Sequence, residues 1–308
     1  MTAGSPWPLL VAGSIARDDV RTPKGENRNA LGGSATYFTL AARLFAPVSV
    51  VATAGNDFMP VFEKAMNGTG ADLRSVSTSD LPTYHWQAEH DYETGTTRNE
   101  HSDQGAYRTF EPVLTPDQRI IPIIFLGSME PRHQLRVLDQ LDRPWLVAGD
   151  TMKEYIWHAP DALAPVLERL DYLFLNASEA IALSAAERLD EATAILRHRY
   201  RLRGLIIKEG RRGATLYRQD VELHLPALPV DPPTDPTGAG DAVAAGFLGC
   251  LAERQSEDEA SLRLALAYAM VMASYAIEDF GIRGLQRVSR QDIEARMTSM
   301  AWEAQPAS

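Results

Sequence analysis

The feature that most constrains this chain is a regular alternation of short apolar runs with amphipathic stretches. The apolar runs have the length and the continuous hydrophobicity of buried strands, and they are Leu9–Ile15, Val48–Ala52, Ile120–Leu126, Trp145–Ala148, Tyr172–Leu175 and Leu205–Ile207. The stretches between them repeat apolar residues with helical spacing, as in Ser34–Phe45, Arg132–Leu141, Asp161–Leu170, Ser178–Ser184 and Asp190–Arg201. Strands that alternate with helices form right-handed crossovers and a mostly parallel sheet covered on both faces. The sequence therefore predicts an α/β protein.

The segment 72–109 departs from this rhythm. It has few residues at helical spacing, and residues 83–88 and 96–101 have the alternating pattern of exposed strands. We expect a small antiparallel ribbon that projects from the main sheet. The predicted organisation is thus an α/β domain of residues 1–71 plus 110–308, into which a β-rich segment of residues 72–109 is inserted.

Charge and composition exclude several classes of protein. The 308 residues include 30 basic and 41 acidic side chains, so the net charge is −11 and the surface repels phosphate backbones and anionic lipids. No uncharged apolar run reaches the ~20 residues that a membrane span needs, and the N-terminus has no secretory pattern. A single cysteine, Cys250, permits neither an internal disulfide nor a thiolate metal site. We expect a cytoplasmic protein with no nucleic-acid partner and no membrane partner.

Several common motifs are absent. The chain contains no Gly-Lys dipeptide, so it has no P-loop, and it contains no Gly-x-Gly-x-x-Gly dinucleotide fingerprint. The His-Glu-x-x-His pattern of zinc peptidases and the Gly-x-Ser-x-Gly pattern of serine hydrolases are also missing. A nucleotide site in this chain must therefore use another device.

The most informative segment is Asp235-Pro-Thr-Gly-Ala-Gly-Asp241, which precedes an apolar helix rich in small residues. Its two glycines permit a tight turn, and the helix that begins there offers unpaired N–H groups at its positive end. Such an end binds anions, and an aspartate beside it can accept a proton from a hydroxyl group while phosphoryl charge is held. These residue types suit the phosphorylation of an alcohol. In the structural alternative, Asp241 is only a first-turn carboxylate that the helix dipole favours.

Three further motifs follow predicted strands or open helices. They are Gly32-Gly33-Ser-Ala-Thr36, Asn176-Ala-Ser-Glu179 and Lys208-Glu-Gly210-Arg-Arg-Gly213. Open α/β sheets bind ligands at the carboxyl ends of their strands, where the last two of these motifs are expected. Taken singly, each also has an ordinary structural interpretation, namely a glycine turn, a helix cap and a hairpin turn.

In this order and spacing, the motifs resemble those of the ribokinase-like carbohydrate kinases, also called the PfkB family. The resemblance spans essentially the whole chain, from Gly13-Ser14-Ile15 with Asp18 just after it to the signature that ends at Asp241. It implies a three-layer αβα domain with a mostly parallel central sheet and a small β lid, the lid being residues 72–109. In relatives such a lid shields the reaction from water and often carries the contact of a homodimer.

The resemblance also implies a role for individual residues. Asp241 matches the catalytic base, and the backbone of Gly238, Ala239 and Gly240 matches the anion hole around the γ-phosphoryl group. ATP and Mg²⁺ are implied, with a monovalent cation such as K⁺ in many relatives. The residues that match nucleotide-binding positions are Asn176, Glu179, Lys208, Gly210, Gly213 and Thr237, with Glu179 holding Mg²⁺ through water. The residues that match acceptor-binding positions are Asp18, Gly32, Gly33 and Thr36.

The acceptor side departs from the sugar-specific pattern. Ala16 stands where relatives commonly place Asn, and the strand that ends at Gly127-Ser128 lacks the acidic residue that ribokinase has near there. Asp150, after the next predicted strand, either contacts substrate or nucleotide or caps a helix. Arg98 in the lid either binds an anionic group of the substrate or is a solvated charge on a strand.

The expected function is ATP-dependent transfer of the γ-phosphoryl group to a hydroxyl of a sugar or sugar-like molecule. Sugars, polyols and nucleosides are the candidate acceptors. A nucleoside kinase of the same fold stays open, in which Tyr37, Phe38 or Trp86 would stack on a base. A nucleotide and ligand sensor without turnover is the alternative from a different class, although an intact Asp241 argues against it.

Overall fold

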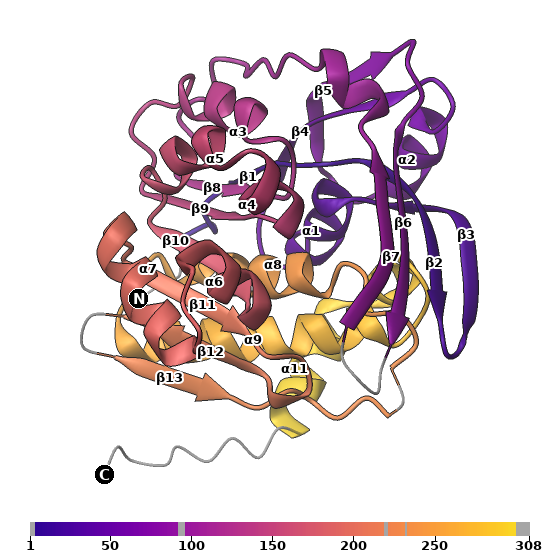
Figure 1. Ribbon diagram of the computed structural model, residues 1–308. Helices are drawn as coiled ribbons and strands as arrows, with labels where there is room; N and C mark the ends of the chain where they lie inside the picture. The colour runs from indigo at the N-terminus through magenta and orange to yellow at the C-terminus, as the bar shows by residue number, and fades with distance from the viewer. Residues whose placement is uncertain (1–3, 92–95, 219–220, 232, 300–308) are drawn as a thin grey trace.

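A computed structural model describes residues 4–91, 96–218, 221–231 and 233–299 of the chain (Figure 1). In this part of the chain the central sheet has nine strands, in the spatial order β13-β12-β11-β10-β9-β8-β1-β4-β5. The strands from β11 to β5 are parallel, and β12 and β13 add an antiparallel edge. In that order their bounds are Glu222–Leu225, Ala214–Tyr217, Gly204–Lys208, Tyr172–Asn176, Leu146–Asp150, Ile123–Leu126, Leu9–Ala12, Val48–Gly55 and Asp72–Ser79. The predicted α/β class with a mostly parallel sheet is confirmed.

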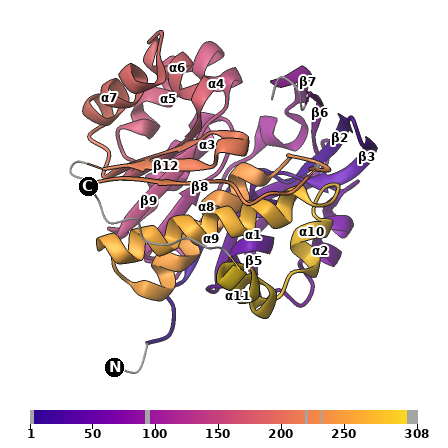
Figure 2. The same ribbon diagram turned by 90° about the horizontal axis from the view of Figure 1, so that it is seen from below.

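Helices cover both faces of this sheet and make three layers (Figure 2). One layer contains α1 (Ser34–Ala42), α2 (Met59–Met66), α8 (Ala239–Arg254), α9 (Glu259–Ile277), α10 (Arg283–Arg287) and α11 (Arg290–Ser299). The other layer contains α3 (Pro131–Leu138), α4 (Lys153–His158), α5 (Pro160–Leu167), α6 (Ala177–Ser184) and α7 (Leu189–Tyr200). Alternate residues of the strands join two separate apolar clusters, one against each layer, as expected for a sheet buried on both faces.

A second, smaller sheet stands beside the main one and has the strand order β3-β2-β6-β7 (Figure 1). Its strands are Gly25–Gly32, Ala16–Thr22, Tyr84–Asp91 and Thr96–Asp103 in that order. Two short 3-10 helices, η1 (Gly105–Thr109) and η2 (Gly210–Arg212), complete the elements. We call this smaller sheet the lid.

The predicted lid boundaries are wrong at their N-terminal side. Residues 72–79 form β5, which pairs in parallel with β4 at the edge of the main sheet. Half of the lid instead comes from residues 16–32, and β2 pairs in parallel with β6 across a separation of about 68 residues. Period-two patterning predicts that a strand exists, but it does not identify a partner strand that is so distant in sequence. The lid is therefore a mixed sheet built from two segments rather than an antiparallel ribbon from one.

Tyr107 ties the segment that leaves the lid to the main sheet. Its buried hydroxyl donates to the Gly13 carbonyl at 2.8 Å and accepts from the N–H groups of Ile15 at 3.0 Å and Thr53 at 3.3 Å. These groups follow or end two adjacent strands, β1 and β4. One buried phenol thus fixes the loop at residues 13–15 on which the acceptor side of the site is built.

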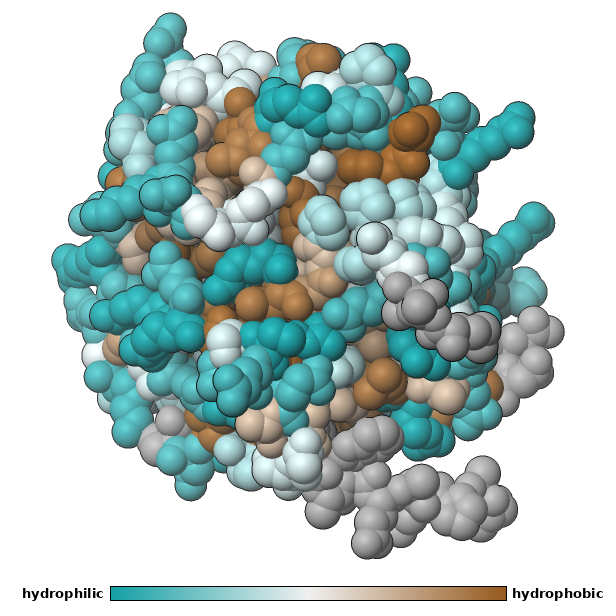
Figure 3. Space-filling model, turned by 180° about the vertical axis from the view of Figure 1, so that it is seen from behind, coloured by the Kyte–Doolittle hydropathy of each residue, from teal (hydrophilic) through white to brown (hydrophobic). Residues whose placement is uncertain are grey.

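Among the described residues, one helix, α9, is long and apolar enough to cross a membrane by length and composition alone. About 67% of its most apolar stretch is buried, and the helix packs along α8 in the core. On the face drawn in Figure 3, hydrophilic side chains surround several smaller apolar areas. Packing within the protein therefore accounts for the apolar character of α9.

Candidate active site

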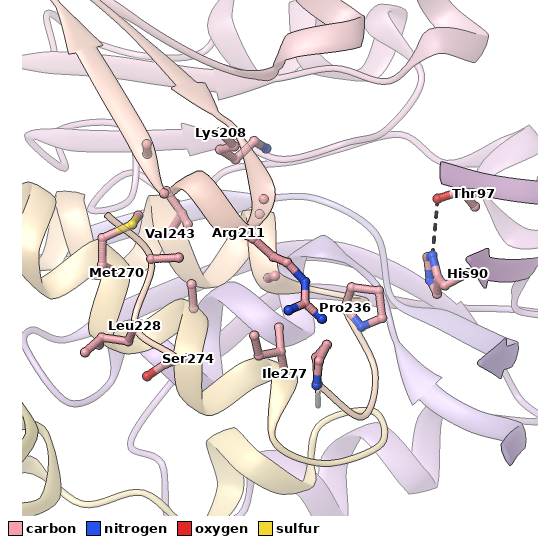
Figure 4. Close-up of a pocket in the computed structure, with 18 of the residues that line it drawn as sticks. His90, Thr97, Lys208, Arg211, Leu228, Pro236, Val243, Met270, Ser274 and Ile277 are labelled. Atoms are coloured by element: carbon pink, nitrogen blue, oxygen red, sulfur yellow. Dashed lines mark hydrogen bonds between the residues drawn. The ribbon is translucent and has the colours of Figure 1, made fainter. Parts of the chain in front are cut away.

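Two cavities meet at the carboxyl ends of the central strands. The larger, of about 400 Å³, is mostly apolar and lies between the β11–β12 turn, the segment 227–239 and helices α8 and α9 (Figure 4). The smaller, of about 260 Å³, lies between the lid, the N-terminus of α1 and the ends of β8, β9 and β11. The residues that line both cavities are His90, Lys208, Pro236 and Gly240. A ligand that spans the two cavities must pass these four residues.

The loop 235–241 is held in place by its own buried aspartate. Asp235 is almost fully buried, and its carboxylate accepts from the Thr237 N–H at 3.0 Å and from the Gly281 N–H at 2.9 Å. Gly238 has φ +75°, and a Cβ there would lie 2.2 Å from the ring of Tyr37. Only glycine meets both conditions without strain. The loop is therefore set by the buried Asp235, which lines neither cavity, and by the ring of Tyr37, which lines the smaller one.

The first turn of α8 begins at this loop. The Ala239 N–H donates to the Pro236 carbonyl at 3.2 Å, and the Ala242 N–H donates to the Gly238 carbonyl at 2.9 Å. Within the described residues, no backbone carbonyl accepts from the N–H groups of Gly240 and Asp241. The predicted anion hole at 238–240 is corrected accordingly, because the Ala239 amide is used by the turn. The Gly240 and Asp241 amides offer the positive end of the helix.

Asp241 lines the smaller cavity and stands next to Gly240, which lines both. Burial raises the pKa of its carboxyl to about 7, while the nearby Lys208 ammonium acts in the opposite direction. A carboxyl group with this pKa is partly ionised at neutral pH, which suits a general base. Lys208, at the end of β11, lies so close that a Cβ on Gly240 would be 2.8 Å from its Nζ.

Asn176 and Glu179 form a capping box at the N-terminus of α6. The Asn176 side chain accepts from the Glu179 N–H at 2.9 Å, and the Glu179 carboxylate accepts from the Asn176 N–H at 2.8 Å. Glu179 also lines the smaller cavity, where burial raises the pKa of its carboxyl. Asn176 lines neither cavity. The helix-cap interpretation of this motif is thus realised, and Glu179 alone of the pair faces the site.

The β11–β12 turn carries the predicted Gly-x-x-Gly motif and lines the larger cavity. Gly210 has φ +59° with open space around it, whereas a Cβ on Gly213 would meet the Leu225 carbonyl at 2.0 Å. Arg211, between them, extends into the cavity in Figure 4. The turn joins two antiparallel strands, so it is a hairpin turn that also forms a cavity wall.

The predicted acceptor-side residues do not all reach a cavity. Asp18 is buried and lines the smaller cavity, and Gly32 leaves room for its carboxylate, since a Cβ there would lie 1.7 Å from Asp18 Oδ2. Burial, with the charges of Asp235 and Asp241, raises the pKa of Asp18 well above its ordinary value. Gly33 also lines the cavity, but the fully buried Thr36 does not.

Two other groups on the acceptor side are already paired within the protein. The N–H groups of Ser34 and Ala35 are not available to a ligand, because the side chain and carbonyl of Ser14 accept from them at 3.0 Å each. Arg98 is exposed, lines neither cavity, and pairs with Asp91 at 2.8 Å. Arg98 is therefore a solvated strand charge rather than a substrate ligand.

Several lining residues were not predicted as site residues. His90 on β6 bonds through Nε2 to the Thr237 hydroxyl at 3.2 Å and through Nδ1 to the Thr97 hydroxyl at 3.2 Å (Figure 4). The alternation of side chains along a strand could have predicted this position for His90. Tyr84, Trp86 and His90 share one face of β6, and all three line the smaller cavity. For Asp150 the sequence left open a ligand contact or a helix cap; it lines the smaller cavity, and it does not cap α4, whose N-cap is Met152.

Comparisons with known proteins agree with this geometry. Residues 147–279 match the family model described as pfkB family carbohydrate kinase. A cytidine kinase of Thermococcus kodakarensis is 29% identical over 246 residues, which are 78% of this chain and 87% of that protein. Two solved structures also match: the nucleoside kinase of Methanocaldococcus jannaschii, an archaeal member of the ribokinase family, and the Burkholderia thailandensis nucleoside kinase in complex with inosine.

The M. jannaschii structure has a TM-score of 0.75 at 19% identity, covering 96% of this chain and 99% of that one. The B. thailandensis structure has a TM-score of 0.74 at 22% identity, covering 94% of this chain and 96% of that one. The fold is therefore that of the ribokinase-like kinases. Over residues 147–279, less than half of its length, the chain is similar to the PfkB family of carbohydrate kinases. It is a phosphotransferase that uses a hydroxyl group of a sugar or nucleoside as acceptor.

Proposed function

We propose that this chain is an ATP- and Mg²⁺-dependent nucleoside kinase that transfers the γ-phosphoryl group to a hydroxyl of the nucleoside's sugar. The observation that carries the proposal is the position of Asp241, on the first turn of α8 where the two cavities meet. The choice of a nucleoside is supported by the relatives, which include a cytidine kinase and a nucleoside kinase bound to inosine.

The larger cavity fits a nucleoside triphosphate. Its apolar wall suits an adenine ring, and the side chains that provide this wall are Leu228, Val243, Met270 and Ile277. At the opposite end are the Lys208 ammonium and the Gly240 amide at the α8 N-terminus, which suit the β- and γ-phosphates. The exposed Arg211 is placed to approach the triphosphate from the open side.

The residues present fit a Mg²⁺ ion that is bound mainly through the nucleotide. Among the described residues, no three His, Cys, Asp or Glu side chains form a cluster that could hold a metal by themselves. Glu179 faces the site with one carboxylate oxygen occupied by its capping bond, so we assign it a contact through water. When bound, Mg²⁺ supplies charge neutralisation on the phosphates.

The proposed mechanism is a direct in-line transfer. Asp241 accepts the proton of the acceptor hydroxyl while the hydroxyl oxygen forms a bond to the γ-phosphorus. The bond from that phosphorus to the bridging oxygen of ADP breaks at the same time. The Gly240 and Asp241 amides and the Lys208 ammonium stabilise the charge on the transferred group. The lid, which reaches the phosphate loop through His90, excludes water from the centre.

A simple sugar or polyol is the second candidate acceptor. It is favoured by the polar character of the smaller cavity, to which Asp18, Asp150 and Ser128 all contribute. Its volume of about 260 Å³ is also modest for a complete nucleoside.

The test is the formation of phosphorylated product from ATP and Mg²⁺ with a panel of nucleosides, sugars and polyols, followed by mass spectrometry. We expect a nucleoside to be the best acceptor and Asp241→Asn to give no product above background. A sugar as best acceptor would select the second candidate, and ATP binding without product from any acceptor would support a sensor. Exchange of K⁺ for Na⁺ in the same assay measures the dependence on a monovalent cation.

A further inference from the structure

The smaller cavity contains an unusual concentration of unpaired polar atoms. In the described part of the chain, eight buried side-chain N or O atoms have no hydrogen-bond partner. Half of them belong to residues that line this one cavity, namely Asp18 Oδ1, Ser128 Oγ, Asp150 Oδ1 and Thr151 Oγ1. A buried polar atom without a partner is costly, and a buried carboxylate is more costly still. This concentration therefore points to a ligand that supplies the missing partners.

Three of these atoms lie at neighbouring strand ends of the main sheet, whereas Asp18 lies on β2 of the lid. Strands β8 and β9 are parallel neighbours with Leu126 paired to Gly149, so Ser128 and Asp150 follow at adjacent strand ends. The buried amide of Gln134 fixes this arrangement, since its Nε2 donates to the Gly127 carbonyl at 3.1 Å and to the Asp150 carbonyl at 3.4 Å. These strand ends are thus held in place before any ligand arrives.

We propose that Ser128, Asp150 and Thr151 form a second acceptor-binding wall in addition to Asp18, and that this wall binds hydrogen-bond donors of the acceptor, hydroxyl or amino groups. This inference rests on the proposed kinase function and names how its acceptor is recognised. All three residues line the smaller cavity and none lines the larger, which places them on the acceptor side rather than the nucleotide side. Asp150 is about 9% exposed and Thr151 about 4%, so neither is satisfied by bulk water.

The position of Asp150 also explains a departure in the sequence. The end of β8, at Gly127-Ser128, lacks an acidic residue, and Asp150 brings a carboxylate to the same region from the neighbouring strand. Burial raises the pKa of Asp150, and the charges of Asp241 and Glu179 add to this effect, while the Lys208 ammonium opposes it. Asp150 therefore lies in the electrostatic field of Asp241, the residue proposed as the base.

The test compares the wild-type enzyme with Asp150→Asn, and with Asp161→Asn as a matched control on the exposed first turn of α5. We expect Asp150→Asn to raise the KM for the acceptor ~10-fold or more while the KM for ATP and the Mg²⁺ dependence stay within twofold. The variant should also discriminate less than the wild type against deoxy or deamino analogues of the best acceptor. An unchanged acceptor KM, or a change confined to ATP or Mg²⁺, would overturn the proposal.

Stability supplies a readout that a merely structural role would not reproduce. Asn removes an ionisable carboxyl group whose buried Oδ1 has no partner, so we expect the acceptor-free variant to melt about 2–4 °C higher than the wild type at neutral pH. The stabilisation that saturating acceptor gives the wild type should be mostly lost. Lower thermal stability without acceptor would contradict the unpaired state of Asp150. If Asp150→Asn fails to fold, Thr151→Val serves as the second test. This variant keeps the shape of the side chain and should raise the acceptor KM severalfold.

Absence of turnover in the wild type has a separate meaning. It would overturn the proposed function, and with it the acceptor wall that rests on this function. If the wild type phosphorylates a nucleoside and Asp150→Asn does so with the same acceptor KM, the proposed acceptor wall is wrong while the proposed function stands.

Discussion

The two sides of the site are built in different ways. The phosphate side carries its groups within seven consecutive residues, 235–241, whose turn is held by the paired carboxylate of Asp235. The acceptor side draws on Asp18 within β2, Ser128 after β8 and Asp150 at the end of β9, and each contributes a buried atom without a partner. The turn of the phosphate side is thus held by the protein's own hydrogen bonds, whereas the acceptor side depends on the ligand to pair these side-chain atoms. We expect substitutions on the first side to affect chemistry and those on the second to affect acceptor binding.

The largest effect is expected for Asp241→Asn on the phosphate side. A general base contributes typically ~10²–10⁴-fold, so kcat should fall by that factor while ATP still binds. Because the pKa of Asp241 in the free enzyme is raised to about 7, wild-type kcat/KM should rise with pH through about 7 and then level off, as the carboxylate forms. A pH–rate profile without this step would show that another group is the base.

The same shift has a consequence for stability. The folded protein holds the proton of Asp241 more tightly than the unfolded chain does, so this residue costs no stability below pH ~4 and destabilises the fold as pH rises through about 7. Asp241→Asn should therefore be at least as stable as the wild type at pH 8, with the advantage lost at pH 4. Chemical denaturation at the two pH values measures this difference.

Lys208→Met should produce the next largest effect. Loss of one preorganised donor to a transferring group costs about 10²-fold, and Lys208 is the cation that lines both cavities on this side. Because the Lys208 ammonium lowers the pKa of Asp241, its removal should also move the pH midpoint of kcat/KM above 7. A lower kcat with an unchanged pH midpoint would show that Lys208 stabilises the transferred phosphoryl group but does not set the pKa of Asp241.

Two glycines of the phosphate loop provide a matched pair. Gly238→Ala places a Cβ against the Tyr37 ring at φ +75°, which costs ~1–2 kcal/mol for the backbone alone, so both thermal stability and activity should fall. Gly240→Ala meets only the flexible end of Lys208 and adds a helix-favouring residue, so stability should be kept while kcat falls about tenfold. Equal losses of stability in the two variants would show that the loop is less rigid than its contacts indicate.

The two sides also differ in what the sequence predicted. The loop 235–241, the capping box at Asn176 and Glu179 and the turn at 210–213 lie where the motifs placed them, because each is encoded by neighbouring residues. The acceptor side was predicted less well: Thr36 and Arg98 do not reach a cavity, whereas Ser128 and His90 line it. Its geometry depends on the pairing of β2 with β6 and of β8 with β9, and long-range pairing leaves little trace in local patterns.

The smallest effect is expected for His90→Ala, which tests the connection between the two sides. His90 is the lid residue that reaches the phosphate loop, through its bond to the Thr237 hydroxyl. A neutral hydrogen bond contributes about 1 kcal/mol, so the closed lid should be several-fold less populated without it. We expect a severalfold higher acceptor KM and a larger ratio of ADP formed to acceptor phosphorylated, since water then reaches the γ-phosphoryl group more often.

The matched control is His101→Ala, on the exposed face of β7, which should leave that ratio unchanged. If both variants retain the wild-type ratio, the contact between His90 and Thr237 does not govern access of water, and the two sides of the site act independently of the lid. If only His90→Ala raises the ratio, one hydrogen bond couples acceptor binding on the lid side to the chemistry at the phosphate loop. In that case the acceptor side, although it supplies no reacting group, still determines how often phosphoryl transfer goes to the correct oxygen.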